Sequence, residues 1–143
     1  MKIFARIALV VLAFVIAPLA LAYVDDAHSR AMEAAAPSVK QGFLVRQEYW
    51  AGTLTVRQPS VVKHQLFKGN TYWFWLGSDE DSAQVTVHVY DPSGKLADAE
   101  AWQNGNKAAV RVVPKKTGTY LIVFSIEQSR AKKNRWALAY GYK

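Results

Sequence analysis

Three carboxylates stand side by side in the stretch "GSDEDSAQ", residues 77 to 84, at Asp79, Glu80 and Asp81. Carboxylate oxygens are ligands that Ca²⁺ prefers in proteins, so this stretch is a weak calcium candidate. It does not match an EF-hand loop, because it has no glycine at the sixth position and no closing glutamate. The alternative is a solvated turn between two strands. We favour the turn, and the sequence predicts no cofactor.

The three histidines, His28, His64 and His88, stand far apart in the sequence. A metal site needs three or four converging ligands, and the chain has no cysteine to complete one. There is no Gly-x-Ser-x-Gly elbow for a nucleophilic serine. Paired carboxylates for sugar hydrolysis need a deep cleft, which a small sandwich rarely builds. We therefore expect no metal site and no enzymatic activity.

Charge is distributed unevenly along the chain. Residues 70–101 hold six acidic residues and one basic residue, whereas residues 102–143 hold nine basic residues and one acidic residue. The stretch "SRAKKNR" supplies Arg130, Lys132, Lys133 and Arg135 in a loop before the last expected strand. Such a patch can bind a protein partner or an anionic cell-envelope polymer. It can equally be a solvated hairpin loop that keeps the domain soluble.

Tryptophan is frequent, with five residues in the chain. Aromatic rings exposed on a sandwich face can stack on sugar rings, so a carbohydrate-binding module is a second hypothesis. Its candidates are Trp102 together with Trp73 or Trp75. Trp102 stands in the polar run "EAWQNGN" and is expected to be the most exposed. The other interpretation, which we favour, is that the tryptophans fill the core of a fold without disulfides.

Residues 1–22 have the pattern of a secretory signal peptide. Lys2 and Arg6 precede an apolar run, and Ala20-Leu21-Ala22 has the small-x-small form of a cleavage site. A retained membrane anchor is the alternative, but the run is short for a spanning helix and Pro18 interrupts it. Cleavage after Ala22 leaves 121 of the 143 residues, with 16 basic and 11 acidic side chains. We expect a periplasmic or secreted protein with no membrane span after cleavage and no nucleic-acid partner.

The rest of the chain divides into a helix and a strand-rich domain. Residues 23–41 form an N-terminal helix or linker, in which Ala, Met and Glu favour a helix over 25–36 and Pro37 is expected to end it. Whether this helix docks on the domain stays open. From residue 42 onwards, apolar residues recur at every second position between turn residues, which is typical of antiparallel strands. The expected strands are 43–48, 52–57, 61–67, 71–77, 84–90, 95–101, 108–113, 119–126 and 135–142.

These strands predict an all-β domain over residues 42–143, a jelly-roll-like β-sandwich of about eight or nine antiparallel strands. In the strand "QVTVHVY", Val85, Val87 and Val89 share one face. The strand "TYWFWLG" carries large apolar groups on both faces, with Trp73 and Trp75 on the opposite side from Phe74. Such a strand is either central in its sheet or presents aromatic rings for binding. The stretch "DPSG", residues 91 to 94, fits a tight turn with Asp first, Pro second and Gly fourth.

Three short motifs in this order resemble the bacterial pre-peptidase C-terminal domain family, over roughly residues 48–143. They are Gly69, Thr71 and Tyr72; Val89, Tyr90, Asp91 and Gly94; and Thr117, Gly118, Thr119, Tyr120 and Val123. The resemblance implies a β-sandwich found beside secreted hydrolases or alone in exported proteins, and an accessory role without catalysis. Many relatives carry acidic residues where the second motif's strand begins. Here that strand begins Gln84-Val85-Thr86, so no metal role is carried over.

The sequence thus favours an exported, non-catalytic binding module. Its partner is a protein or a cell-envelope polymer, with Arg130, Lys132, Lys133 and Arg135 as the first candidate surface. A carbohydrate-binding module that uses the tryptophans is the alternative, and a hydrolase is less favoured.

Overall fold

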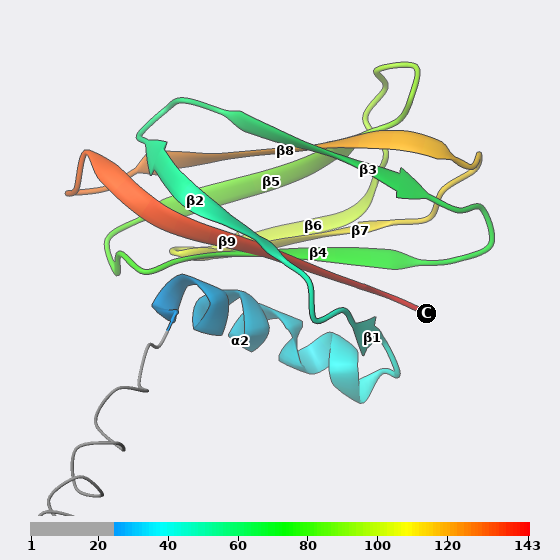
Figure 1. Cartoon of the computed structure of the whole chain (residues 1–143), viewed down its shortest axis with the longest axis horizontal. Coiled ribbons are helices and arrows are strands. Elements are labelled where there is room, and N and C mark those ends of the chain that lie inside the picture. Colours follow the sequence, from blue (N-terminus) through cyan, green and yellow to red (C-terminus); the bar gives the residue numbers. More distant parts are fainter. Residues whose placement is uncertain (1–24) are drawn as a thin grey trace, which may run out of the picture.

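The computed structural model describes residues 25–143, so the expected signal peptide lies outside the described residues. Within them the chain forms one helix and nine strands (Figure 1). The strands make two antiparallel sheets packed face to face, which confirms the predicted β-sandwich.

The larger sheet, sheet A, has six strands. They are β1 (Leu44–Val45), β2 (Trp50–Thr55), β4 (Tyr72–Ser78), β6 (Asp98–Asn104), β7 (Lys107–Val112) and β9 (Lys133–Tyr142). Their order is β1-β9-β4-β7-β6, and β2 pairs with the same edge of β9 beyond β1. Sheet B has three strands in the order β3-β8-β5, namely β3 (Ser60–Leu66), β8 (Gly118–Gln128) and β5 (Gln84–Tyr90).

The main core lies between the two sheets. The alternation predicted for β5 is confirmed, because Val85, Val87 and Val89 are buried in this core. Sheet A contributes Phe74 from β4 and Leu138 from β9, both with no exposed surface. Burial of such side chains supplies the main driving force for a fold that contains no disulfide.

Helix α2 (Asp26–Lys40) lies along the outer face of sheet A (Figure 1). Asp25 caps its start, since its side chain accepts a hydrogen bond from the backbone N–H of His28 at 3.2 Å. The buried face of the helix consists of small residues: Ala27, Ala31, Ala34, Ala35 and Ser38. A Cβ atom on Gly77 of β4 would stand 2.4 Å from the backbone nitrogen of Ala31. The helix backbone therefore rests directly on the sheet, which answers the question of docking.

Pro37 does not end the helix, which continues to Lys40. A proline in the last turn removes one backbone donor there. The end of the helix is instead closed by Gly42, whose φ is +94° and whose N–H donates to the carbonyl of Val39 at 3.0 Å. The N–H of Phe43 donates to the carbonyl of Ser38 at 3.1 Å, which completes the cap.

Two strands differ most from their predicted ranges. The strand expected over 43–48 is confined to β1, because the chain loops outwards and rejoins β9 at Trp50. The strand expected over 95–101 begins later, at Asp98. Asp98 lies beside β5, where its carboxylate accepts from the N–H of Val89 at 2.8 Å and contacts His88 at 2.7 Å. These side-chain contacts set the point at which β6 begins, and strand alternation cannot reveal them.

Candidate functional site

The connections between strands gather at two opposite ends of the sandwich (Figure 1). The first, which we call the hairpin end, contains the loops 56–59, 79–83, 105–106 and 129–132. The second, which we call the groove end, contains the loops 67–71, 91–97 and 113–117. Antiparallel strands alternate in direction, so segments far apart in the sequence meet at each end.

The hairpin end holds the basic residues predicted as a binding surface. Arg130, Lys132, Lys133 and Arg135 are all exposed. The loop is shorter than expected, because β9 begins at Lys133 and carries the last two of these residues. Arg57 joins them from the β2–β3 loop with φ +67°, and its N–H donates to the carbonyl of Ile126 at 2.8 Å. No signal in the sequence links Arg57 to residues about 75 positions later.

The β8–β9 loop is held by side chains rather than left free in solvent. Asn134 is 2% exposed, accepts a hydrogen bond from the hydroxyl of Ser129 at 2.6 Å and donates to the carbonyl of Ala131 at 3.0 Å. The N–H of Arg130 donates to the hydroxyl of Ser82 at 3.0 Å. The basic loop is thereby joined to the acidic β4–β5 loop, which stands about 50 residues earlier in the sequence.

The predicted calcium candidates lie in that acidic loop, next to the bases. Glu80 accepts hydrogen bonds from the hydroxyl of Ser82 at 2.8 Å and from its N–H at 3.3 Å. These bonds, with the charge of Arg130 as a smaller cause, lower the pKa of Glu80. Asp81 lies 3.7 Å from Arg30 of the helix. Among residues 25–143, no group of three or more acidic or histidine side chains is placed to hold a metal ion, so the calcium interpretation of Asp79, Glu80 and Asp81 gains no support.

The groove end contains a groove of about 690 Å³ between the β5–β6 and β7–β8 loops. Its walls include two exposed apolar side chains, Leu96 with 60% and Val113 with 50% of their surface accessible. Three lysines, Lys68, Lys95 and Lys115, also line it, together with Asp91 and Asp98, whose carboxylates accept hydrogen bonds from backbone N–H groups nearby. An apolar surface edged by cations suits an acidic segment that carries an apolar side chain.

The "DPSG" turn shapes one wall of this groove. One carboxylate oxygen of Asp91 accepts from the N–H of Ser93 at 2.9 Å, from its hydroxyl at 2.7 Å and from the N–H of Lys95 at 2.9 Å. The bond from the Ser93 hydroxyl is the largest cause that lowers the pKa of Asp91, followed by the bond from the Lys95 backbone. The N–H of Gly94 closes the turn onto the carbonyl of Asp91 at 2.9 Å. This turn is structural, as the sequence predicted, and it sets where Lys95 and Leu96 stand.

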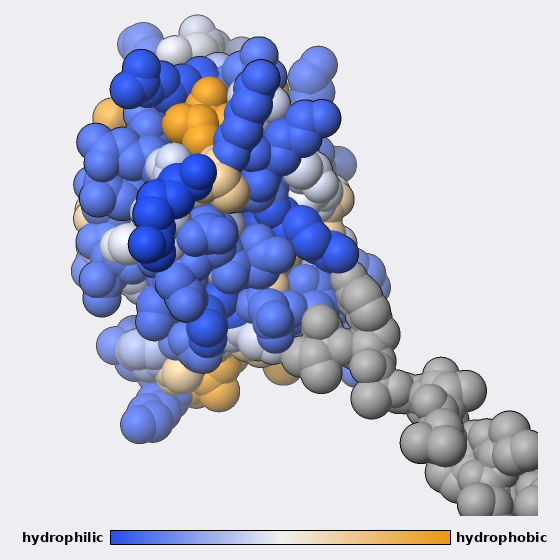
Figure 2. Space-filling model, turned by 90° about the vertical axis from the view of Figure 1, so that its left-hand side faces the viewer, coloured by the Kyte–Doolittle hydropathy of each residue, from blue (hydrophilic) through white to orange (hydrophobic). Residues whose placement is uncertain are grey.

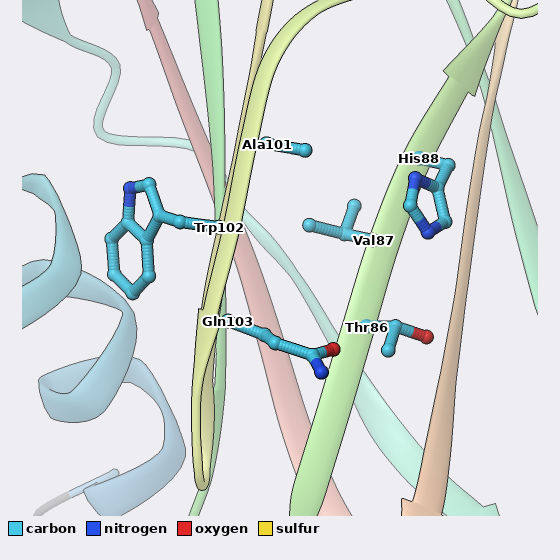
Figure 3. Close-up of a pocket in the computed structure, with 6 residues that line it drawn as sticks. All are labelled: Thr86, Val87, His88, Ala101, Trp102 and Gln103. Atoms are coloured by element: carbon cyan, nitrogen blue, oxygen red, sulfur yellow. The ribbon is translucent and has the colours of Figure 1, made fainter.

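The tryptophans proposed to stack on sugars are not on a bare surface. Trp75 has no exposed surface and Trp73 only 6%, because α2 covers both rings. Trp102, expected to be the most exposed of the tryptophans, is half-buried and packs against the same cluster. A small hollow of about 210 Å³ lies between β5 and β6, but the Trp102 ring points away from it, towards the helix (Figure 3). A carbohydrate site built from these three residues would require the helix to move.

Comparisons with known proteins add one finding about the fold. No family model matches this sequence, and no curated protein matches it. Among solved structures, it is similar to PliG of Aeromonas hydrophila, a periplasmic lysozyme inhibitor of g-type lysozyme. That match has a TM-score of 0.52 and 18% identity over 72% of this chain and 90% of that chain. The prophage-derived protein YomS matches with a TM-score of 0.34 and 9% identity, over 70% of this chain and 99% of that one, and nothing is inferred from it.

At 18% identity, the likeness to PliG shows a shared sandwich fold and no more. The resemblance to the pre-peptidase C-terminal family gains no support from a family model and stays a prediction. Among the described residues, no helix is both long and apolar enough to cross a membrane.

Proposed function

We propose that the protein is an exported, non-catalytic binding module that docks an acidic segment of a partner protein in the groove at the groove end. One observation carries the proposal. Seven large apolar side chains are exposed among residues 25–143, and two of them, Leu96 and Val113, line this groove. None stands in the hairpin-end loops.

This arrangement supports protein binding because stable interfaces combine an apolar centre with a polar rim. A few apolar or aromatic side chains near the centre usually carry most of the binding free energy. Leu96 and Val113 supply such a centre, and Lys68, Lys95 and Lys115 supply the rim. The lysines select for a partner whose docking segment carries negative charge.

The hairpin end is a poorer docking surface, although it is strongly basic. Its surface is mainly hydrophilic, with small apolar patches between the polar side chains (Figure 2), and its bases stand beside Asp79, Glu80 and Asp81. Exposed charges contribute little to affinity at physiological salt. We propose that Arg130, Lys132, Lys133 and Arg135 speed the approach of an acidic partner, while the groove holds it. An anionic cell-envelope polymer is the alternative partner for these four residues.

Two observations guide the proposed location and the proposed class of partner. The signal peptide over residues 1–22 would deliver the domain, residues 42–143 with its docked helix, to the periplasm or beyond. PliG, which shares the sandwich fold, is a periplasmic inhibitor of a protein, g-type lysozyme. A g-type lysozyme is therefore the first purified partner to try, and its binding would also test whether this chain inhibits.

The experiment compares the native chain over residues 23–143 with two variants of it, and this range contains every described element. The groove variant carries Leu96→Asp and Val113→Asp, and the control carries Ser at Arg130, Lys132, Lys133 and Arg135. Each bait captures proteins from a periplasmic extract, and the affinity of the captured partner is then measured by biolayer interferometry. We expect the groove variant to bind at least about 30-fold more weakly and the control less than about fivefold more weakly.

Equal melting temperatures of the three baits ensure that lost binding does not reflect unfolding. A partner retained by the groove variant and lost by the control would move the binding surface to the hairpin end. A native bait that captures no protein would reject protein binding altogether.

A further inference from the structure

A second hollow, of about 300 Å³, opens on the side of the sandwich between β3 and the loop that joins β1 to β2. Its lining includes Arg46, His64, Phe67, Asn70, Tyr140 and Tyr142. These residues come from three separate stretches of sequence, and none was among the candidates that the sequence indicated. We call this hollow the aromatic cleft.

Five of the eight residues that line the cleft carry aromatic rings. The ring of Tyr140 lies 4.7 Å from His64 and 5.4 Å from Trp50, measured between centroids. Trp50 and His64 meet edge to face at 5.3 Å, so the three rings support one another. Phe67 stands at the rim with half of its surface exposed. Unlike Trp73 and Trp75, these rings have no helix over them.

Polar groups in the cleft are held in place by the backbone and by each other. The N–H of Arg46 donates to the carbonyl of Tyr140 at 2.9 Å, which fixes where the arginine side chain begins. The amide of Asn70 donates to the hydroxyl of Tyr72 at 3.3 Å, and that hydroxyl also accepts from the N–H of Phe67 at 2.9 Å. The turn that carries Phe67 and Asn70 is therefore anchored to β4.

The cleft offers one cation and one neutral ring. Arg46 lies 3.4 Å from Glu48, and the charge of Glu48 is the largest cause that raises the pKa of the guanidinium. Burial lowers the pKa of His64, so its imidazole is neutral at pH 7 and can both donate and accept a hydrogen bond. The Arg46–Glu48 pair is exposed, with 41% and 71% of the side chains accessible, and such pairs are weak. A ligand carboxylate can therefore replace Glu48 on the guanidinium.

We propose that the aromatic cleft binds a single sugar ring that carries a carboxylate. Arg46 pairs with the carboxylate, the exposed ring of Phe67 and the half-buried tyrosine rings contact the apolar face of the sugar, and His64 and Asn70 bond to its hydroxyls. The volume is at the lower limit for ligand sites, which suits one ring rather than a longer chain. This site is separate from the groove, and it relocates carbohydrate binding from the tryptophans to residues that the solvent reaches.

The test is an NMR titration of ¹⁵N-labelled residues 23–143 with glucuronate, glucose and acetate at millimolar concentrations. We expect glucuronate to shift amide signals at residues 46, 64–70 and 140–142. Glucose shares the ring and acetate shares the carboxylate, and both should bind at least about tenfold more weakly. Equal binding of acetate would make the cleft a simple anion site and overturn the proposal. Equal binding of glucose would overturn the role of Arg46, and the absence of shifts would overturn the site.

Variants separate the cleft from the rest of the surface. Arg46→Gln should weaken glucuronate binding about tenfold or more and leave glucose binding unchanged. Tyr142→Leu should weaken the binding of both glucuronate and glucose. The matched control is Arg111→Gln, another arginine paired with a glutamate, Glu100 at 3.2 Å, on the far side of sheet A from the cleft. Loss of glucuronate binding in this control as well would assign the effect to overall charge and overturn the proposal.

Discussion

The two ends of the sandwich are both basic, yet they are built for different tasks. At the hairpin end, buried Asn134 holds the β8–β9 loop, Ser82 links that loop to the acidic one, and acids stand next to the bases. At the groove end, lysines and the acids Asp91 and Asp98 line the same groove as Leu96 and Val113, at least half of whose surface stays exposed. Positive charge alone therefore does not locate a binding surface. What distinguishes the two ends is whether exposed apolar side chains stand among the charged ones.

Substitution of a glycine should have the largest effect on the free energy of unfolding. The glycines at the two ends differ in how closely other atoms surround them. Gly77→Ala places a methyl group 2.4 Å from the backbone of α2 near the hairpin end, so the helix must shift. We expect a loss of about 3 kcal/mol in the free energy of unfolding, measured with urea. Gly69 of the groove end has open space around it but φ +102°, so Gly69→Ala should cost only about 1 kcal/mol. Equal losses would contradict the tight contact between α2 and sheet A.

Asn134→Ala should destabilise the hairpin end by about 2 kcal/mol. The substitution removes both hydrogen bonds of a buried amide and leaves the hydroxyl of Ser129 without its acceptor. The exposed Asn104→Ala is the control and should change the free energy of unfolding by less than about 0.5 kcal/mol. Partner binding at the groove should be unaffected in both variants. A loss of partner affinity in Asn134→Ala alone would show that the two ends are coupled.

The pH dependence of stability should separate the aromatic cleft from both ends. Burial lowers the pKa of His64 in the folded protein, so the unfolded chain binds more protons there as the pH falls. The neutral His64 contributes its full share of stability above the unfolded pKa of about 6.5. That share is lost as the pH falls from there through the lower folded pKa. His64→Phe should therefore flatten the fall in stability between about pH 7 and 5, measured by thermal melting. An unchanged slope would contradict the burial of His64.

Below about pH 4, acidification should destabilise the two ends of the sandwich alike. The pKa values of Glu80 and Asp91 are lowered by hydrogen bonds within their own loops. Their contribution is present above their unfolded pKa values and is lost as the pH falls through the folded ones. Both side chains remain partly accessible to solvent, so the effect is small. Asp91→Asn should remove the acid-dependent stability contributed at the groove end and leave the contribution of Glu80. Melting temperatures measured as the pH is lowered give the difference.

The smallest effect should come from the four hairpin-end bases. With Ser at Arg130, Lys132, Lys133 and Arg135, we expect slower partner association at low salt and almost no change at 0.15 M salt. The reason is that exposed charges act over distance and are screened. Association and dissociation rates measured at two salt concentrations check this. A faster dissociation at both salt concentrations would place these residues in the interface.

Much of the architecture is readable from local pattern. Period-two alternation locates nine strands, and the "DPSG" turn follows from the preferences of its own four residues. The same alternation places Trp73 and Trp75 opposite Phe74. It cannot say whether that second face is bare, because the answer depends on whether the residues before Gly42 return to cover it.

The candidate sites were harder to foresee for the same reason. The four basic residues are adjacent in sequence, so their cluster was visible at once. Arg57 was missed, since it reaches the hairpin end from the β2–β3 loop. The groove needs the β5–β6 and β7–β8 loops side by side, and the aromatic cleft needs Arg46, His64 and Tyr140 together.

The sequence by itself determined the sandwich class, the strand periodicity, the turns and the sign of the charge, because each of these depends on residues within a few positions of one another. Only the tertiary structure decided which apolar face α2 covers, which bases have acids beside them, and which aromatic rings solvent can reach. Those outcomes depend on the pairing of distant strands, and a strand's own residues carry almost no information about its neighbours beyond which of its faces is apolar.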